Sequence, residues 1–178
     1  PLEYLHRHDQ SIVSQREINI DTESYLSALR ASLRQSPDVI LLGELRDYET
    51  MSVAMTAAET GHLIFSTLHT LGAANTIDRI IDAFPASEQS QIAMQLSMVL
   101  QCVISMQLVP SVDGQQIAVF EVMTVTPAIR NMIRENKIPQ IEGALYSSNK
   151  EDMISMDNSL FNLYKAGTIT KETALEYA

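Results

Sequence analysis

Two short apolar runs stand out along the chain, and each leads into residues that suit phosphate chemistry. The run Val39-Ile40-Leu41-Leu42 shows no alternation of polar and apolar positions and is followed at once by Gly43-Glu44. The run Leu63-Ile64-Phe65 leads in the same way into Ser66-Thr67-Leu68-His69-Thr70. Unbroken apolar runs of this length predict strands that are buried on both faces, as in a parallel sheet.

The residues between these two runs predict a helix. Asp47 to Thr60 is rich in Met and Ala, and Gly61 is a plausible stop. Strand, helix and strand in this order form a βαβ unit with a right-handed crossover. Ligands of such sheets bind beyond the carboxyl ends of the strands, so we expect Glu44 and His69 to lie together there.

The rest of the pattern predicts an α/β part followed by a helical part. Residues 11–18 are compatible with a short strand, and Asp21-Thr22 can cap a helix that ends near Ser36, before Pro37. Further helices are predicted at 72–83, 86–100, 127–135, 140–146, 155–165 and 170–178, and strands at 103–109 and 116–123, joined by a turn at Asp113-Gly114. The change near Thr124 predicts an α/β domain at residues 1–124 and a helical region at 125–178.

Composition narrows the class of protein. The chain has 178 residues, of which 46% are hydrophobic, and this is typical of a globular protein. A formal net charge of −10 argues against a nucleic-acid partner bound through a broad basic face. The single cysteine, Cys102, excludes a disulfide framework and suits a reducing compartment. The chain begins with Pro1 rather than Met, and we expect it to be a piece of a longer protein.

Glu44 and His69 are the first candidates for chemistry. A carboxylate directly after a buried strand is costly unless a cation or hydrogen bonds compensate it. In nucleotide hydrolases a carboxylate at this place holds magnesium or orients the attacking water, although Glu44 could equally be an ordinary acid at a strand end. An imidazole at His69 could hydrogen-bond a phosphate oxygen, but a lone histidine more often bonds a backbone carbonyl. The other histidines do not have a metal-ligand spacing with it.

Several arginines are further candidates. Arg30 and Arg34 are four residues apart and share a helix face, where solvated charges are commoner than phosphate contacts. Together with Arg46 they are possible phosphate or interface contacts. The segment Ala128-Ile129-Arg130-Asn131-Met132-Ile133-Arg134-Glu135 has arginines four apart among apolar positions. It could also be a charged surface helix packed through its apolar side.

The order and spacing of these segments resemble the type II/IV secretion ATPases. Residues 33–47 look like their Walker B box, residues 56–70 resemble their histidine box, and Pro1-Leu2-Glu3-Tyr4-Leu5-His6 is similar to the tail of their aspartate box. The resemblance covers nearly the whole chain and weakens after Ala144. The 128–135 helix resembles the one typical of pilus retraction ATPases, which favours retraction over assembly or general secretion.

The resemblance implies a RecA-like P-loop NTPase core, incomplete at its N-terminal side, followed by a helical C-terminal region. It implies that Glu44 is the Walker B glutamate acting near Mg²⁺ and the attacking water. Glu3 would be an aspartate-box carboxylate that helps to position this water, and His69 would sense the γ-phosphate of ATP. Arg130 and Arg134 would serve motor output rather than hydrolysis.

One departure from the family matters most. No G-x-x-x-x-G-K-[ST] sequence is present, so the loop whose amides and lysine hold the phosphates is absent from these residues. We therefore expect this chain alone to bind ATP weakly or not at all, and its sheet to have exposed edges.

The resemblance also implies partners and a place in the cell. It predicts a homohexameric motor that couples ATP hydrolysis to type IV pilus retraction at the cytoplasmic face of the inner membrane, against a platform protein. The alternatives are an assembly or type II secretion ATPase, or a non-catalytic interaction fragment of such a motor. A DNA-translocating relative is disfavoured by the acidic charge balance.

Overall fold

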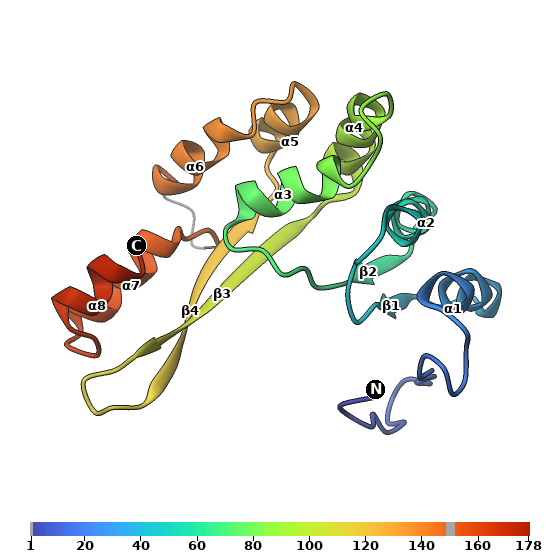
Figure 1. Cartoon of the computed structure of the whole chain (residues 1–178), viewed down its shortest axis with the longest axis horizontal. Coiled ribbons are helices and arrows are strands. Elements are labelled where there is room, and N and C mark those ends of the chain that lie inside the picture. Colours follow the sequence, from blue (N-terminus) through green and yellow to red (C-terminus); the bar gives the residue numbers. More distant parts are fainter. Residues whose placement is uncertain (1, 149–151) are drawn as a thin grey trace. The chain divides into compact units, whose positions relative to one another are not determined.

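The computed structural model describes residues 2–148 and 152–178 and has the predicted α/β character (Figure 1). Its contacts divide the chain into two compact units, Pro1–Leu68 and His69–Ala178.

Helix α1 (Tyr25–Ser32) is the first helix of the first unit. It begins three residues later than predicted, because Ser24 rather than Asp21-Thr22 caps it and accepts a hydrogen bond from the Ser27 amide. The chain continues as a short 3₁₀ turn, η1 (Leu33–Gln35), and leaves the helical region at Ser36, whose φ is 52°. The predicted end before Pro37 is thus confirmed.

The predicted βαβ unit is present. Strand β1 (Val39–Leu41) and strand β2 (Leu63–Phe65) are parallel neighbours, joined by helix α2 (Tyr48–Glu59). Asp47 caps α2 by accepting a hydrogen bond from the Thr50 amide, which explains why the helix starts there.

The two strands are not buried on both faces, and that prediction is wrong for these residues. Ile40 is only 8% exposed and packs in a cluster with Leu29 and Ala54, so α1 and α2 cover its face of the sheet. On the opposite face Leu41 is 68% exposed and Phe65 is 54% exposed. An unbroken apolar run predicts two covered faces, but the first unit supplies a layer for one face only.

The predicted strand at residues 11–18 is also wrong. This segment has no strand, and its last residue, Ile18, makes only an isolated bridge with Thr22. The side chain of Gln15, within this segment, binds the preceding residues instead. It donates a hydrogen bond to the Tyr4 carbonyl and accepts one from the His6 amide. A strand needs a partner strand for its backbone groups, and the described part of the first unit offers none here.

The described residues of the second unit form an antiparallel hairpin and six helices. Strands β3 (Cys102–Pro110) and β4 (Gln116–Thr124) pair along their whole length, and the turn contains Gly114 with a φ of 80°. The helices are α3 (Ala73–Asp82), α4 (Gln89–Val99), α5 (Pro127–Arg134), α6 (Pro139–Tyr146), α7 (Met156–Lys165) and α8 (Lys171–Glu176). All eight elements occur where the sequence pattern predicts them, with small differences at their ends.

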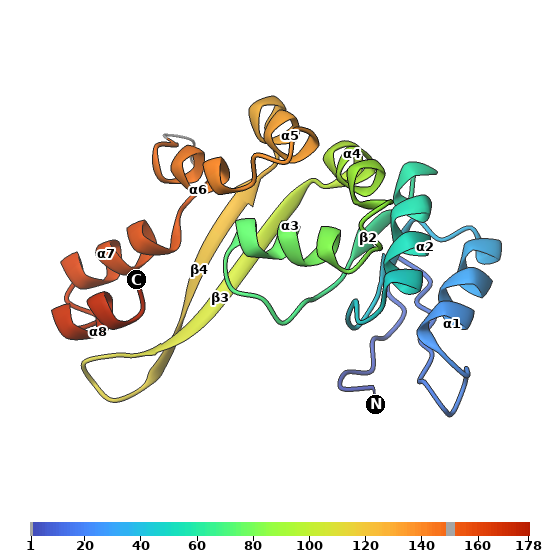
Figure 2. The same ribbon diagram turned by 45° about the horizontal axis from the view of Figure 1, so that its top comes forward.

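Helices cover one face of the hairpin, as Figures 1 and 2 show for α3. Towards the turn, Val109 and Val119 of the strands form a core with Met156, Leu160 and Ile169. Val122 of β4 exchanges two backbone hydrogen bonds with Ile154, which ties α7 to the hairpin. The C-terminal helices therefore belong to the same compact unit as the strands, and the division into domains near Thr124 stays a prediction.

Candidate functional site

The segments that follow β1 and β2 run side by side. The Leu42 amide donates to the Phe65 carbonyl, at 2.9 Å, and the Leu45 amide donates to the Thr67 carbonyl, at 3.0 Å. The Thr67 hydroxyl donates in return to the carbonyl of Gly43, at 2.7 Å. The loop that carries Glu44 is therefore held to the last residues of the predicted histidine box at the carboxyl ends of the strands, where parallel sheets bind ligands.

Glu44 has the compensating cation that its position requires. The Nη2 atom of Arg46 lies 2.6 Å from its Oε1 atom, and the Glu44 side chain is 18% exposed whereas that of Arg46 is 71% exposed. The hydrogen bond from this guanidinium and the charge of Glu44 raise the pKa of Arg46. A half-buried carboxylate whose arginine partner is exposed to solvent can accept a hydrogen bond from a water or coordinate a cation.

Tyr25 packs against the backbone of this loop. A Cβ atom added to Gly43 would lie 3.2 Å from the Tyr25 hydroxyl, closer than ordinary van der Waals contact. Glycine next to Glu44 therefore lets α1 approach the loop closely.

His69 opens the second unit, whereas Glu44 belongs to the first. The expectation that these two residues lie together therefore stays a prediction. The residue after His69 is fixed within the second unit: the hydroxyls of Thr70 and Thr76 share a hydrogen bond of 2.8 Å, and Thr76 donates to the Gly72 carbonyl. His62, by contrast, places its Nδ1 atom 3.0 Å from the Ala57 carbonyl, as a structural histidine does.

The remaining charged candidates of the first unit lie on its surface. Arg30 and Arg34 are exposed, one at the end of α1 and the other in η1. Glu3 is exposed in a segment without regular secondary structure, and Pro1 of the same motif lies outside the described residues. Their roles in nucleotide chemistry stay predictions.

Arg130 has a structural role that the sequence did not indicate. Its guanidinium donates to the carbonyls of Ser97 and Met98, at 2.6 and 2.9 Å, and so satisfies the last carbonyls of α4. Arg134, one turn further along α5, is exposed and donates to Asn131 on its own helix, at 2.8 Å. The two arginines of the predicted motor signature thus have different surroundings.

Glu121 is a residue that the sequence reasoning missed. It lies on the covered face of β4, directly opposite Ser105 of β3. Its Oε1 atom accepts a hydrogen bond from the Ala73 amide at 2.7 Å, and its Oε2 atom accepts one from the Met156 amide at 3.2 Å. An acidic residue at an inward position of an alternating strand was the available signal.

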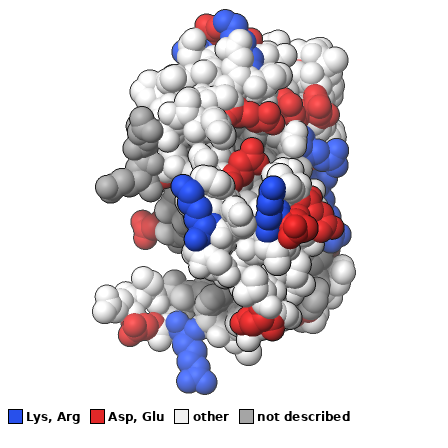
Figure 3. Space-filling view, turned by 90° about the vertical axis from the view of Figure 1, so that its left-hand side faces the viewer, with Lys and Arg blue, Asp and Glu red and all other residues white. Residues whose placement is uncertain are grey.

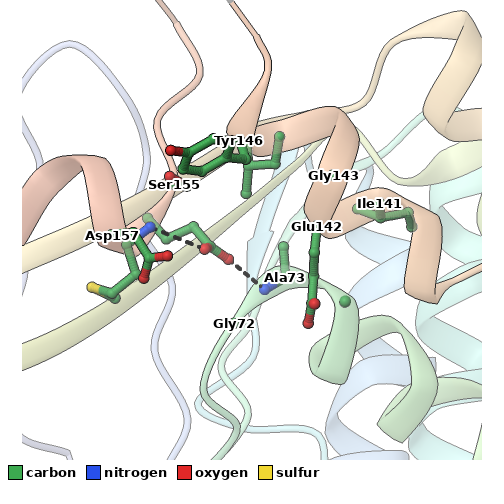
Figure 4. Close-up of a pocket in the computed structure, with 12 residues that line it drawn as sticks. Gly72, Ala73, Ile141, Glu142, Gly143, Tyr146, Ser155 and Asp157 are labelled. Carbon is green, nitrogen blue, oxygen red and sulfur yellow. Dashed lines mark hydrogen bonds between the residues drawn. The ribbon is translucent and has the colours of Figure 1, made fainter. Parts of the chain in front are cut away.

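These contacts border a pocket of about 460 Å³ between α3, α6, α7 and β4. The hydrogen bonds of Glu121 are the dashed lines in Figure 4, which also shows Glu142 and Asp157 at the pocket. The charged residues among its described lining are acidic, so the described part of the pocket offers no cation to a phosphate group.

Two other kinds of feature are absent from residues 2–148 and 152–178. No cluster of three or more His, Cys, Asp or Glu side chains there could hold a metal ion by itself. No helix in that part of the chain has the length and apolar character needed to cross a bilayer. On the face drawn in Figure 3, acidic side chains lie among the basic ones, with no broad basic surface over the described residues.

Known proteins resemble this chain over its whole length. The family model "Type II/IV secretion system protein" matches residues 1–173. The "Type IV pilus retractation ATPase PilT" of Pseudomonas aeruginosa is 47% identical over all 178 residues, which correspond to 52% of that protein. A "Twitching motility protein" of Neisseria gonorrhoeae is 48% identical over 98% of this chain and 47% of its own length.

A solved structure agrees with the sequence comparisons. The chain superimposes on the crystal structure of the pilus retraction motor PilT with bound ADP with a TM-score of 0.92, at 47% identity, covering all of this chain and 50% of the other. The chain thus spans about half the length of the relatives that it matches. With its family model, its relatives and its fold in agreement, the chain belongs to the type II/IV secretion system protein family.

Proposed function

We propose that this chain is the catalytic second half of a motor ATPase that drives type IV pilus retraction. The observation that carries the proposal is the position of Glu44, a half-buried carboxylate at the carboxyl end of a parallel strand with a solvent-exposed arginine partner. The similarity to pilus retraction proteins supports the choice of retraction. The full-length protein would carry the phosphate-binding loop upstream of these residues.

In this proposal Glu44, Glu3 and His69 act on water and phosphate. Mg²⁺, held through one carboxylate and waters, would neutralise the phosphates of ATP. Glu44 would accept a hydrogen bond from the water that attacks the γ-phosphate or from a water bound to the metal, once Arg46 turns away. Glu3 would help to position the attacking water, and His69 would report the loss of the γ-phosphate. Arg30 and Arg34 are exposed and free to meet a phosphate or a neighbouring subunit.

The partners of the motor belong to the same proposal. A homohexamer at the cytoplasmic face of the inner membrane would pass the movement of each subunit to the platform protein of the pilus. Arg130 and Arg134 would act at this output step, downstream of hydrolysis. A pilus assembly ATPase or a type II secretion ATPase is the alternative within the family, and a non-catalytic interaction fragment is the alternative outside enzymes.

Glu44→Gln in the full-length protein tests the role of Glu44. Glutamine keeps the shape of the side chain but loses the charge, so we expect ATP turnover to fall by at least about 100-fold while ATP still binds. Glu49→Gln, at an exposed position in the first turn of α2, is the matched control and should keep wild-type turnover. Wild-type turnover in Glu44→Gln would remove Glu44 from its assigned role.

A further inference from the structure

Helix α3 follows the predicted histidine box directly, and its N-terminus is capped from outside. Its N-cap residue is Gly72, which has no side chain to accept the amides of the first turn. The hairpin supplies the acceptors instead: the Ser105 hydroxyl accepts from the Gly72 amide at 2.9 Å, and Glu121 accepts from the Ala73 amide at 2.7 Å. Ser105 and Glu121, which face each other across β3 and β4, thus supply the acceptors that a capping side chain would otherwise supply.

The same carboxylate reaches a second helix. The second oxygen of Glu121 accepts from the amide of Met156, the first residue of α7. Both helix N-termini carry partial positive charge, and a carboxylate between them is stabilised by both.

Hydrogen bonds connect this clamp to Thr70, the residue that follows His69. Thr70, the next residue, shares a bond with the buried Thr76 hydroxyl, which also donates to the Gly72 carbonyl. From Gly72 and its neighbour Ala73 the bonds continue to Ser105 and Glu121. All of these residues lie within the second unit, so one continuous polar path runs from the end of the histidine box to the first turn of α7.

We propose that Glu121 is a positioning residue for the motor: it locks the start of α3 to the start of α7 and thereby fixes the segment that carries His69. The inference rests on the proposed role of His69 as the sensor of the γ-phosphate. Loss of the phosphate would shift this segment, and the clamp would carry the shift to the C-terminal helices. In this role Glu121 would act through the segment that carries His69 and not on the nucleotide itself.

The clamp is tested first by amide hydrogen exchange of the full-length protein. In Glu121→Ala both acceptors are lost, so the amides of Ala73 and Met156 should exchange at least about tenfold faster than in the wild type. Glu121→Gln has a single carbonyl oxygen, and its amide group repels the second N–H, so only one of the two amides should stay protected. Glu142→Gln lines the same pocket at an exposed position and is the matched control, with unchanged exchange. Unchanged exchange in Glu121→Ala would overturn the clamp.

The action through His69 is tested by steady-state kinetics. We expect kcat of Glu121→Ala to fall by about 10- to 100-fold with KM for ATP changed less than about 2-fold, because positioning rather than binding is lost. Adding His69→Ala should then lower kcat little further, since the two residues would act as a unit. Additive losses, or wild-type kcat in Glu121→Ala, would overturn the inference. Wild-type kcat in His69→Ala alone would instead show that the assigned role of His69 is wrong, and the inference would fall with it.

Discussion

The Arg130 guanidinium lies 2.6 Å from the Ser97 carbonyl and thereby caps the C-terminus of α4. Arginine at a helix C-terminus satisfies carbonyls that have no partner within the helix and meets the negative end of its dipole. The predicted retraction signature therefore contains one arginine that holds α5 to α4 and one, Arg134, that stays on the surface of its own helix.

This difference predicts separable effects of the two arginines. Arg130→Ala should destabilise the protein by about 1.5–3 kcal/mol, because carbonyls at the end of α4 lose a charged donor. Arg134→Ala should change the free energy of unfolding by less than about 0.5 kcal/mol. Urea unfolding of both variants measures these values. Equal stability of the two variants would contradict the structural role of Arg130, and pilus retraction in the stable Arg134→Ala variant would then test motor output alone.

Gly72 should tolerate no side chain. Its φ of 84° and ψ of 147° lie in a region that is almost restricted to glycine, so Gly72→Ala should cost about 1–3 kcal/mol. Gly143 is the matched control, because it lies inside α6 with nothing within 4 Å of an added Cβ. Gly143→Ala should stabilise the protein by about 0.5–1 kcal/mol. Thermal unfolding of the pair gives the comparison, and two shifts of the same sign would contradict it.

Replacement of Asp78 should stabilise the protein in a pH-dependent way. Burial and the nearby charge of Asp82, one turn along α3, raise the pKa of Asp78. A carboxyl group with a raised pKa in the folded state destabilises the fold when ionised, and this penalty is absent below its unfolded pKa and complete at neutral pH. Asp78→Asn should therefore raise the free energy of unfolding at pH 7 by about 0.2–0.5 kcal/mol. The gain should disappear below about pH 4. A gain that grows on acidification would contradict this account.

The open face of the first unit predicts self-association of the isolated chain. Leu41 and Phe65 are neighbours on this face and more than half exposed, and exposed apolar surface on a sheet favours association. Leu41→Thr with Phe65→Thr should reduce association of this chain in sedimentation experiments. The same pair should destabilise the full-length protein, in which we propose that upstream residues cover the face. Unchanged association in the double variant would show that a different surface causes the association.

Local patterns predicted the helices and the hairpin because their signals lie close together in sequence. The capping residues of α2, α7 and α8 each precede their helices directly, and the turn glycine Gly114 follows Asp113. Periodicity then fixed which positions point inward.

Features that depend on distant partners could not be predicted in this way. The amide that Glu121 accepts from lies 48 residues away on α3, and the carbonyl that Arg130 caps lies 33 residues away. The open face of β1 depends on which layers are present, and an apolar run such as Val39 to Leu42 carries no information about that. The predicted strand at 11–18 failed for the same reason, since β propensity is realised only beside a partner strand.

The central claim is that these residues complete an ATPase whose phosphate-binding loop lies upstream. The most direct measurement compares Mg²⁺-dependent ATP binding and hydrolysis by this chain alone and by the chain joined to the P-loop segment. We predict that binding and turnover appear only in the joined protein and that Glu44→Gln abolishes the turnover but not the binding. A folded, oligomeric joined protein that neither binds nor hydrolyses ATP would contradict the claim and favour a non-catalytic interaction module.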